Sequence, residues 1–215
     1  MKTKFAIGIP TINRGNDLLF PSLFLYVTKD FPNTDIYIID NGNQNLKAKI
    51  KNLKNVYLIE EDNNLGVSAS WNKLCGIIFK NYEYAFILND DIYLGYGENI
   101  VEQEIKKYKS ALVQAQSTWA AFLISKSIFN KVGDFEESFF PAYFEDNDYV
   151  YRMKLLNIAV ISSFKLMPTI MRESSSSNKD TSLIKNFSKN KGIYIEKWGG
   201  EVGKEKFKRP YNANI

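Results

Sequence analysis

The sequence of 215 residues contains no histidine and a single cysteine, Cys75. Without histidine, a zinc site with histidine ligands and a Ser-His-Asp triad are both excluded, because each requires an imidazole. A general base that acts near neutral pH must then be a carboxylate or, less often, a lysine, a tyrosine, a cysteine or water. One cysteine forms no intrachain disulfide, and its position in an apolar helical stretch indicates an inert core thiol.

Long apolar runs and strong charge of one sign are also missing. No run reaches the length of a transmembrane helix, and Phe5–Pro10 is too short for the apolar region of a signal peptide. We therefore expect a cytoplasmic protein without an integral membrane segment. The net charge of +4 is small and its lysines are scattered, which does not indicate nucleic-acid binding. With 45% hydrophobic and 24% charged residues, we expect one globular domain over residues 1–215.

Asn89, Asp90 and Asp91 follow directly after the apolar residues Ala85–Leu88, which predict a short buried strand. Adjacent carboxylates at the end of such a strand repel each other and lose hydration, unless a cation offsets both costs. Mg²⁺ and similar ions bind one or two protein carboxylates and take their other ligands from water and phosphates. Asn-Asp-Asp is also good turn chemistry, so the triplet by itself leaves both a turn and a metal site open.

Polar clusters also follow the first two predicted strands, at Thr11–Arg14 and at Asp40–Asn41. The elements expected in this half are strands at 5–10, 35–40 and 56–60 and helices at about 16–29, capped by Asn16 or Asp17, and 45–53. Strands that alternate with helices predict parallel β/α units, in which ligands bind beyond the carboxyl ends of the strands. The three polar clusters therefore predict one shared site at that edge of the sheet.

The stretch Asp62–Asn72 opens a further predicted helix. Its expected buried face consists of Trp71, Leu74, Cys75 and Ile78. Its start and exposed side are expected to consist of Asn64, Gly66, Ser68 and Asn72. This segment is interpreted either as a plain helix cap or as backbone amides that are presented to a phosphate or a base.

Glu145, Asp146 and Asp148 fall in the first turn of a helix that is expected to begin near Glu145. The helix dipole favours acids there, which explains them without a site. It does not explain the aromatic run Phe139–Phe144 before them, and an acid beside aromatic walls suits sugar recognition combined with proton abstraction. Asp148 and Arg152, four residues apart, are expected to pair. The predicted buried stripe is Tyr149, Val150, Met153 and Leu156.

The remaining elements expected are helices at 98–109, 127–132 and 181–191 and strands at 111–116, 120–125 and 159–171. The low-complexity stretch Ser174–Asp180 is either a plain linker or a loop that orders over a ligand.

Taken together, these stretches resemble the GT-A fold glycosyltransferases, most of all the family 2-like group that uses nucleotide-sugar donors. The resemblance runs from Phe5 to about Gly200. It implies an α/β protein with a single GT-A (Rossmann-like) domain, a mostly parallel central sheet flanked by helices, and a smaller acceptor-side part. It also implies a nucleotide-binding half over about residues 1–95, an acceptor-side half over about 96–200, and a basic tail over 201–215.

On the nucleotide side, Ile9–Arg14 resembles the family's base-binding strand and loop, Ile39–Gly42 its second-strand acid, and Asn64–Gly66 its Asn-x-Gly helix start. Trp71 stands where many relatives carry an arginine. The nucleotide-binding residues that the resemblance implies are Pro10, Thr11, Asn13, Arg14, Asp40, Asn41, Asn64, Gly66, Asn72, Asn89 and Asp90.

Asn89–Asp91 resembles the family's Asp-x-Asp motif, with asparagine in place of the first acid. This implies Mn²⁺ or Mg²⁺ held by Asp91, with Asp90 on the ribose or on a metal-bound water. Phe144–Tyr149 resembles the Glu-Asp acceptor motif, whose base would be Asp146, and Lys197–Gly199 resembles a recurrent C-terminal element. The implied acceptor- or sugar-binding residues are Trp119, Tyr143, Glu145, Asp148, Lys197 and Trp198.

The implied activity is that of a hexosyl- or deoxyhexosyltransferase. Its partners would be a nucleotide-sugar donor, with UDP favoured, and a carbohydrate acceptor, and inversion is expected. One alternative is a sugar-phosphate nucleotidylyltransferase, which needs a glycine-rich loop with arginine and lysine where this chain offers only Gly15. A second alternative is a catalytically silent carbohydrate-binding module on the same fold.

Overall fold

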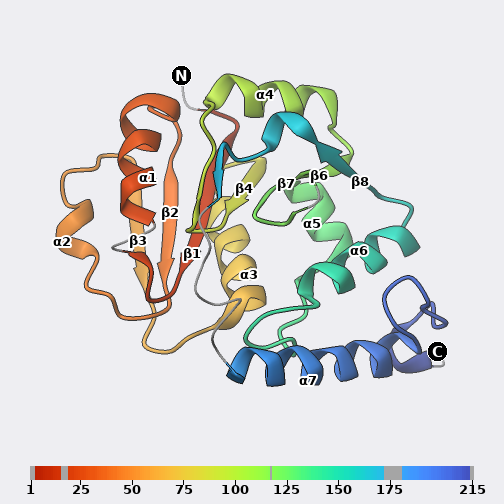
Figure 1. Cartoon of the computed structure of the whole chain (residues 1–215). Coiled ribbons are helices and arrows are strands. Elements are labelled where there is room, and N and C mark those ends of the chain that lie inside the picture. Colours follow the sequence, from red (N-terminus) through yellow and green to blue (C-terminus); the bar gives the residue numbers. More distant parts are fainter. Residues whose placement is uncertain (1–2, 16–18, 117, 172–180, 214–215) are drawn as a thin grey trace.

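The computed structural model describes residues 3–15, 19–116, 118–171 and 181–213 (Figure 1). A central sheet has the strand order β3-β2-β1-β4-β7-β6-β8. Its strands are β1 (Phe5–Thr11), β2 (Ile36–Asp40), β3 (Val56–Glu60), β4 (Tyr84–Leu88), β6 (Ala111–Ala115), β7 (Ala121–Ser125) and β8 (Ala159–Ser163). Neighbouring strands pair in parallel, except that β7 runs antiparallel to both β4 and β6. The predicted mostly parallel α/β sheet is confirmed.

Helices surround this sheet, with α4 at one end and α7 along the opposite edge (Figure 1). The helices are α1 (Phe20–Leu25), which continues into a π-helical turn (Tyr26–Asp30), α2 (Lys47–Ile50), α3 (Gly66–Ile78), α4 (Glu98–Lys107), α5 (Lys126–Val132), α6 (Glu145–Leu155) and α7 (Thr181–Trp198). Short 3₁₀ turns cover Phe164–Leu166 and Pro210–Asn212. A second, antiparallel sheet consists of β5 (Ile92–Tyr93) and β9 (Ile170–Met171).

The core lies on both faces of the sheet, because alternate residues of each strand point in opposite directions. In β1, Phe5 and Ile7 belong to the cluster beneath α1 and α4, whereas Ala6 belongs to the cluster beneath α3. A side chain at Gly8 would lie 3.2 Å from Cβ of Leu74, so glycine lets α3 approach the sheet closely. Burial on both faces explains why the strand sequences are continuously apolar.

A third apolar cluster attaches the C-terminal helix to the rest of the domain. Its members are Phe139, Phe144, Tyr151, Tyr194 and Trp198. The ring of Tyr151 on α6 meets that of Trp198 on α7 edge to face, with centroids 4.8 Å apart. This packing holds α7 against α6.

The start of α3 differs from the prediction of an exposed side. Gly66 and Ser68 are both buried, because the loop at Phe140–Pro141 covers this end of the helix. A side chain at Gly66, where φ is +76°, would lie 2.8 Å from the Phe140 ring, and Val67 N donates to the Pro141 carbonyl at 2.8 Å. The expected buried face of Trp71, Leu74, Cys75 and Ile78 is confirmed.

Several element boundaries also differ. The helix expected at 45–53 covers only Lys47–Ile50, and the helix expected at 181–191 continues through Gly192 to Trp198. The strand expected at 159–171 is broken by a 3₁₀ turn, in which the amide of the second residue, Lys165, donates to the Ser163 hydroxyl. Leu156, expected in the buried stripe of α6, is 38% exposed because the helix ends at Leu155. The predicted caps Asn16 and Asp17 and the stretch 174–180 lie outside the described residues.

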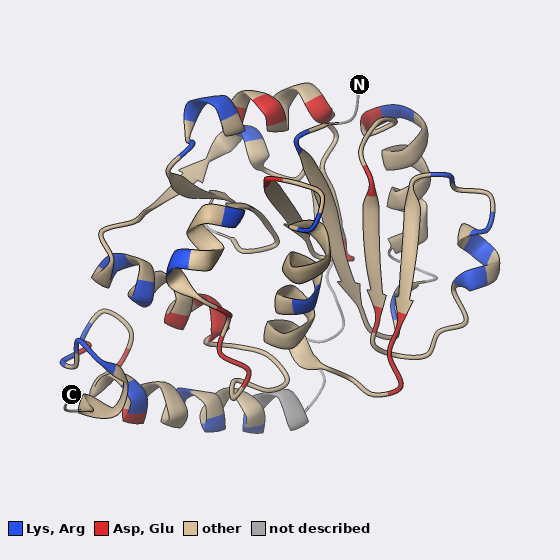
Figure 2. Cartoon of the chain, turned by 180° about the vertical axis from the view of Figure 1, so that it is seen from behind, with Lys and Arg blue, Asp and Glu red and all other residues tan. Residues whose placement is uncertain are grey.

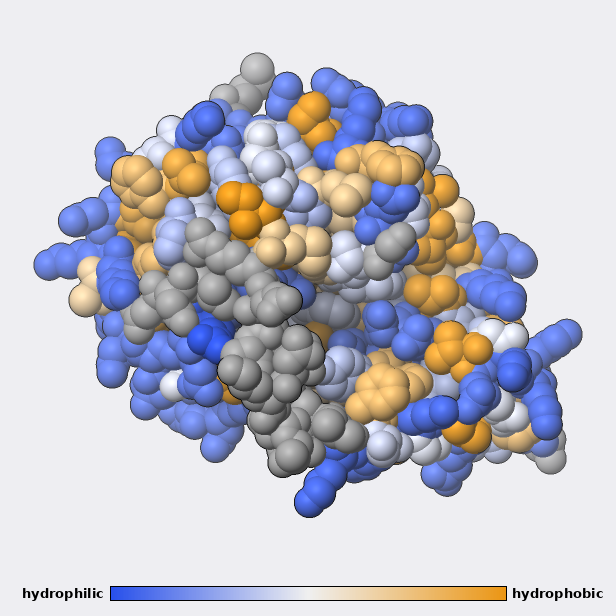
Figure 3. Space-filling model, viewed as in Figure 1, coloured by the Kyte–Doolittle hydropathy of each residue, from blue (hydrophilic) through white to orange (hydrophobic). Residues whose placement is uncertain are grey.

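The surface carries apolar side chains in separate patches. On the face drawn in Figure 3 they alternate with polar ones, and exposed examples in the chain are Phe24 at 63% and Phe164 at 73%. Among the described residues, none of the helices has both the length and the apolar character that crossing a membrane requires.

Candidate active site

The acids at the end of β4 lie against the loop that follows β1. The carboxylate of Asp90 accepts hydrogen bonds from the Thr11 hydroxyl and from the Ile12 amide. Burial raises the pKa of Asp90 to about 6, and the charge of Asp91 adds to this rise, while the bond from Thr11 opposes it. The strand ends of β1 and β4 therefore meet, and they bring together two carboxylates whose shared negative charge is unfavourable.

The donor set suits a hard divalent cation that is shared with a phosphate ligand. Among the described residues, no group of three or more His, Cys, Asp or Glu side chains gathers into a metal centre. A structural zinc site with four protein ligands does not fit this arrangement. Asp90 and Asp91 offer one or two carboxylates, which is what Mg²⁺ or Mn²⁺ takes from a protein when phosphates and water complete its shell. The residues present therefore fit such an ion.

Asp40 is fully buried and organises the loop that follows β2. Its carboxylate accepts from the backbone amides of Gly42 at 2.9 Å and Gln44 at 2.8 Å, and from Nε2 of Gln44 at 2.8 Å. Gln44 Oε1 in turn accepts from Gly15 N at 2.6 Å, which joins the loops after β1 and β2. Direct contact of Asp40 with a nucleoside stays a prediction, and the structure shows a carboxylate already engaged by its own loop.

Gln44 is a residue that the sequence analysis missed. It connects two loops that are 29 residues apart in the chain, and no local motif marks it. The only sequence signal is its position four residues after the strand-end acid, where a side-chain amide can reach back to that carboxylate.

Asparagines hold the start of α3 beside the strand ends. The side-chain amide of Asn41 donates to the Ser70 hydroxyl at 2.9 Å, and its oxygen accepts from Leu65 N at 3.2 Å. Asn64 Oδ1 accepts from Gly66 N at 2.9 Å. The helix start is thereby fixed to the loop after β2, so Asn41 and Asn64 shape the edge at which they were predicted to bind a nucleotide.

The remaining residues predicted on the nucleotide side lie in different settings. Asn72 Nδ2 donates to the Phe135 carbonyl at 2.9 Å, and its Oδ1 accepts from Phe135 N at 2.8 Å. That amide therefore holds the connection between α5 and α6 instead of facing the strand ends. Pro10 lies inside β1, one residue before its end, and is partly buried. In the loop that follows, Asn13, with φ of 58°, is exposed and Arg14 is partly buried.

Asn89 extends the pairing of β4 with the chain that enters β7. Its backbone N donates to the Ala120 carbonyl at 2.8 Å. This bond sets the neighbouring Trp119 beside the strand-end acids. The Trp119 indole stacks on that of Trp71 in α3, with centroids 6.0 Å apart and planes 24° from parallel. The sequence predicted Trp119 as a sugar-binding residue, and the structure brings it to the edge where Asp90 and Asp91 lie.

Two acids with raised pKa values lie at the start of α6. Glu145 is only 7% exposed, and burial together with the charge of Asp146 raises its pKa to about 8. Burial also raises the pKa of Asp146, although the amide of Asn147 donates to Asp146 Oδ1 at 2.8 Å and opposes the shift. Within the described residues, Oε2 of Glu145 has no hydrogen-bond partner. Perturbed carboxyl groups of this kind are typical of sites that move protons.

Asp148, in contrast, is part of a buried polar network between α6 and α7. It accepts from Arg152 Nε at 2.8 Å, as predicted from their spacing, and from Trp198 Nε1 at 2.8 Å. Lys197 Nζ lies 2.8 Å from Oδ1 of the same carboxylate and 2.8 Å from Glu136. All three predicted acceptor residues in this network, Asp148, Lys197 and Trp198, face one another in the interior. These contacts attach α7 to α6, and contact of the three residues with an acceptor stays a prediction.

The aromatic run before α6 is covered by the middle of α7. Asn190 Nδ2 donates to the Ala142 carbonyl at 2.8 Å, and the Tyr143 ring meets Phe187 at a centroid distance of 5.5 Å. Tyr143 is partly buried and has φ of 80°. Figure 2 shows acidic residues at the ends of β2 and β3 and near the start of α6, in the same half of the view.

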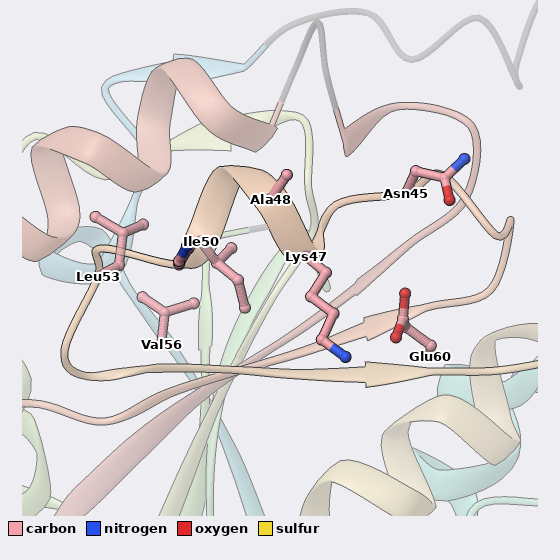
Figure 4. A pocket seen from close by; sticks show the side chains of 8 residues that line it. Asn45, Lys47, Ala48, Ile50, Leu53, Val56 and Glu60 are labelled. Carbon is pink, nitrogen blue, oxygen red and sulfur yellow. The ribbon is translucent and has the colours of Figure 1, made fainter.

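A separate hollow of about 720 Å³ lies between α2 and β3 (Figure 4). The aliphatic side chains of Ile50, Leu53 and Val56 line it, with Lys47 and Glu60 at one end. None of the predicted site residues lines this hollow. It is therefore distinct from the edge that carries Asp90 and Asp91.

No family model and no curated protein matches the sequence. Solved structures do match it. The mannosyltransferase PcManGT from Pyrobaculum calidifontis, in complex with GDP-Man and Mn²⁺, has a TM-score of 0.64 at 10% identity over 81% of this chain and 59% of its own. TarS 1–349 from S. aureus, in complex with UDP-GlcNAc, has a TM-score of 0.64 at 15% identity over 91% of this chain and 66% of its own.

GalNAc-T7 with UDP, GalNAc and Mn²⁺ has a TM-score of 0.71 at 12% identity over 91% of this chain and 48% of its own. The chain has the GT-A fold. The GT-A architecture predicted from the sequence is thereby confirmed. The chain spans between 48% and 66% of the length of these three structures.

Proposed function

We propose that this chain is a metal-dependent glycosyltransferase that moves a hexosyl or deoxyhexosyl group from a nucleoside-diphosphate sugar to a hydroxyl of a carbohydrate acceptor, with inversion. The observation that carries the proposal is the pair Asp90–Asp91 at the end of β4, held against the loop after β1 in a GT-A fold. GT-A neighbours in complex with GDP-Man, UDP-GlcNAc or UDP support a nucleotide-sugar donor, and UDP is the favoured nucleotide.

On the donor side, Asp91 would hold Mn²⁺ or Mg²⁺, and Asp90 would contact the ribose or a water bound to the ion. Such an ion, when bound, supplies Lewis-acid stabilisation of the charge that develops on the leaving diphosphate. Thr11 and Ile12 orient Asp90 before the ligand arrives, so less order has to be imposed on binding. The loop joined by Gln44 and Gly15 would receive the base, together with the backbone near Asn13.

On the acceptor side, Asp146 is the proposed general base. The acceptor oxygen forms a bond to the anomeric carbon as the bond from that carbon to the diphosphate oxygen breaks. The electron pair of the broken bond leaves with the diphosphate, and the acceptor proton passes to Asp146. Burial raises the pKa of Asp146, which makes its carboxylate a stronger base than a solvated aspartate.

The chemistry divides the chain between two halves. We assign residues 1–95 to the nucleotide and 96–200 to the acceptor, with a basic tail at 201–215. This division is supported by the contacts of Asp90 with the loop after β1 and by the location of Asp146 at the start of α6.

The proposal is tested in two steps. Thermal unfolding is measured with UDP, GDP and their sugar conjugates, each with and without Mn²⁺, because a ligand of the folded state raises the melting temperature. Release of nucleoside diphosphate from the stabilising conjugate is then followed over hours with Mn²⁺. We expect metal-dependent stabilisation and slow release. Stabilisation without any release favours a silent binding module, and no stabilisation by any nucleotide overturns the proposal.

A further inference from the structure

Trp119 lies next to the strand-end acids for a structural reason. β7 runs antiparallel to β4, so the chain enters β7 at the edge where β4 ends. The bond from Asn89 N to the Ala120 carbonyl, at 2.8 Å, fixes this entrance beside Asp90 and Asp91. A group bound at these acids therefore has Trp119 as a neighbour. Trp119 precedes β7, a strand that begins at the site, whereas β4 ends there.

An aromatic cluster supports the Trp119 indole from below. Trp71, which is 3% exposed, stacks under it, and the Phe122 ring lies 4.8 Å from its centroid. Phe135 meets Trp119 edge to face at 6.4 Å. Trp119 itself keeps part of its surface exposed. A flat apolar ring that is braced in this way and open on its remaining surface can accept a ligand ring without moving.

We propose that Trp119 is the platform on which the sugar ring of the nucleotide donor lies, and that Trp71 is the positioning residue beneath it. This inference rests on the proposed function. In a nucleotide sugar the pyranose is attached directly to the diphosphate. If Asp91 holds the diphosphate, the pyranose therefore lies beside Trp119 at the same edge of the sheet. The base lies at the far end of the diphosphate, near the loops of Gly15 and Gln44.

The chemistry of the two surfaces is complementary. One face of a pyranose presents C–H groups with a small positive charge, and the face of an indole carries negative quadrupole charge. Burial of the apolar C–H face adds a hydrophobic contribution. The four rings of the cluster carry no formal charge, so the donor class that they favour is a neutral hexose or deoxyhexose and not a sugar acid.

Two buried polar atoms next to the platform have no partner within the described residues. They are the indole N–H of Trp71 and the hydroxyl of Ser68, which lie three residues apart on α3, and both residues are 3% exposed. Unsatisfied groups of this kind are rare in folded proteins, and a hydroxyl of a ligand or a water molecule supplies what they lack. Because Trp71 lies beneath Trp119, this partner reaches them from the α3 side and not from the open face of the Trp119 ring.

The test compares affinities for a nucleotide with and without its sugar. Calorimetry with Mn²⁺ is performed with UDP, UDP-glucose, UDP-galactose, UDP-GlcNAc and UDP-glucuronate, and with GDP and GDP-mannose. The wild type is compared with Trp119→Ala, Trp119→Phe and, as a matched aromatic control, Phe164→Ala, which removes an exposed ring in the 3₁₀ turn after β8. We expect Trp119→Ala to reduce the gain in affinity from a neutral sugar by about fivefold or more. Trp119→Phe and Phe164→Ala should keep that gain.

Other results would contradict the platform, the donor class or the proposed function. Equal loss of affinity for the nucleoside diphosphate and its sugar conjugate in Trp119→Ala overturns the platform, as does an unchanged gain from the sugar. A larger gain from glucuronate than from neutral sugars overturns the donor class. If the wild type binds no nucleoside diphosphate with Mn²⁺, the proposed function itself fails. Should Trp119→Ala not fold, Trp119→Leu keeps apolar volume without the ring face and takes its place.

Discussion

The hydroxyl of Thr11 donates a hydrogen bond to the carboxylate of Asp90 and thereby joins the end of β1 to the acidic pair after β4. The orientation of Asp90 is therefore set by a residue that is 79 positions earlier in the chain, and not by the Asn-Asp-Asp triplet itself. Because the Thr11 hydroxyl is in place before any ligand binds, Asp90 does not have to be ordered when the ligand arrives.

Replacement of Asp91 by asparagine is expected to abolish the dependence of nucleotide affinity on divalent metal. The substitution keeps the size of the side chain but removes the negative charge that a hard cation requires. Calorimetry with UDP, with and without Mn²⁺, measures the effect. Asp62→Asn, at an exposed position after β3, is the matched control and should retain the dependence. An unchanged metal dependence in Asp91→Asn would remove Asp91 from the metal site.

Replacement of Asp146 by asparagine should leave donor binding intact and slow sugar transfer by at least about a hundredfold. The residue is the proposed acceptor of the proton, and the proposed nucleotide contacts lie on other loops. The rate of transfer and the donor affinity are measured on the same preparation. Near-normal transfer would shift the role to Glu145 or to a mechanism without a protein base.

Glu145→Gln should gain stability relative to the wild type as pH rises from 5 to 8.5. The pKa of Glu145 is raised to about 8 by burial and by Asp146, whereas the ordinary value is 4.5. Between these values the folded state binds more protons than the unfolded chain, so wild-type stability falls as pH rises through this window. Glutamine carries no proton to lose, and we expect a difference of more than about 1 kcal/mol.

Urea unfolding at both pH values measures this difference. Glu196→Gln, at an exposed position on α7, is the control and should follow the wild type at each pH. A Glu145→Gln variant whose stability relative to wild type is the same at pH 5 and 8.5 would contradict the raised pKa.

Loss of the Asp40 carboxylate should loosen the loop after β2. Asp40→Ala leaves the amides of Gly42 and Gln44 without their acceptor, which costs about 1–3 kcal/mol of unfolding free energy. Affinity for UDP should fall with it. Gln44→Ala distinguishes a loop-shaping role of Asp40 from direct contact with the nucleotide, because it breaks the link to Gly15 but leaves the Asp40 carboxylate in place. Weaker UDP binding in both variants supports a loop-shaping role, and a loss in Asp40→Ala alone supports direct contact.

Removal of the Asp148 carboxylate should detach α7 from α6. Asp148→Ala leaves Arg152 and the nearly buried Lys197 without this shared partner, which is expected to cost about 3–5 kcal/mol. Lys191→Ala breaks the exposed ion pair with Glu201 and should cost less than about 1 kcal/mol. Urea unfolding compares the two, and equal effects would contradict the role of the buried network.

The fold was accessible to sequence analysis because apolar periodicity and strand-end polarity are local signals. The strand at Ala85–Leu88 and the buried face of α3 around Trp71 are read from neighbouring residues alone, and both are confirmed. The pairing of Asp148 with Arg152 follows from helical spacing in the same way. The roles of Asn72 and Gln44 do not, because their partners Phe135 and Gly15 are far away in the chain.

The burial of Gly66 and Ser68 has the same cause. The residues near Gly66 and Ser68 in the sequence do not indicate that the loop at Phe140–Pro141 covers the start of α3, because that loop lies far away in the chain. The sequence also does not show which groups Lys197 and Trp198 contact within the protein. Their polar atoms are satisfied by Asp148, 49 and 50 residues earlier, and only the packed structure shows that pairing.

The reversed direction of β7 changes where binding residues are to be sought. In a wholly parallel sheet every strand delivers its site residues after it ends, so inspection of the residues that follow each strand finds them all. β7 instead approaches the same edge with its first residues, and Trp119 and Ala120 therefore precede their strand. Substitutions that alter which sugar is accepted are accordingly expected in the connection that leads into β7, upstream of the strand and not downstream of it.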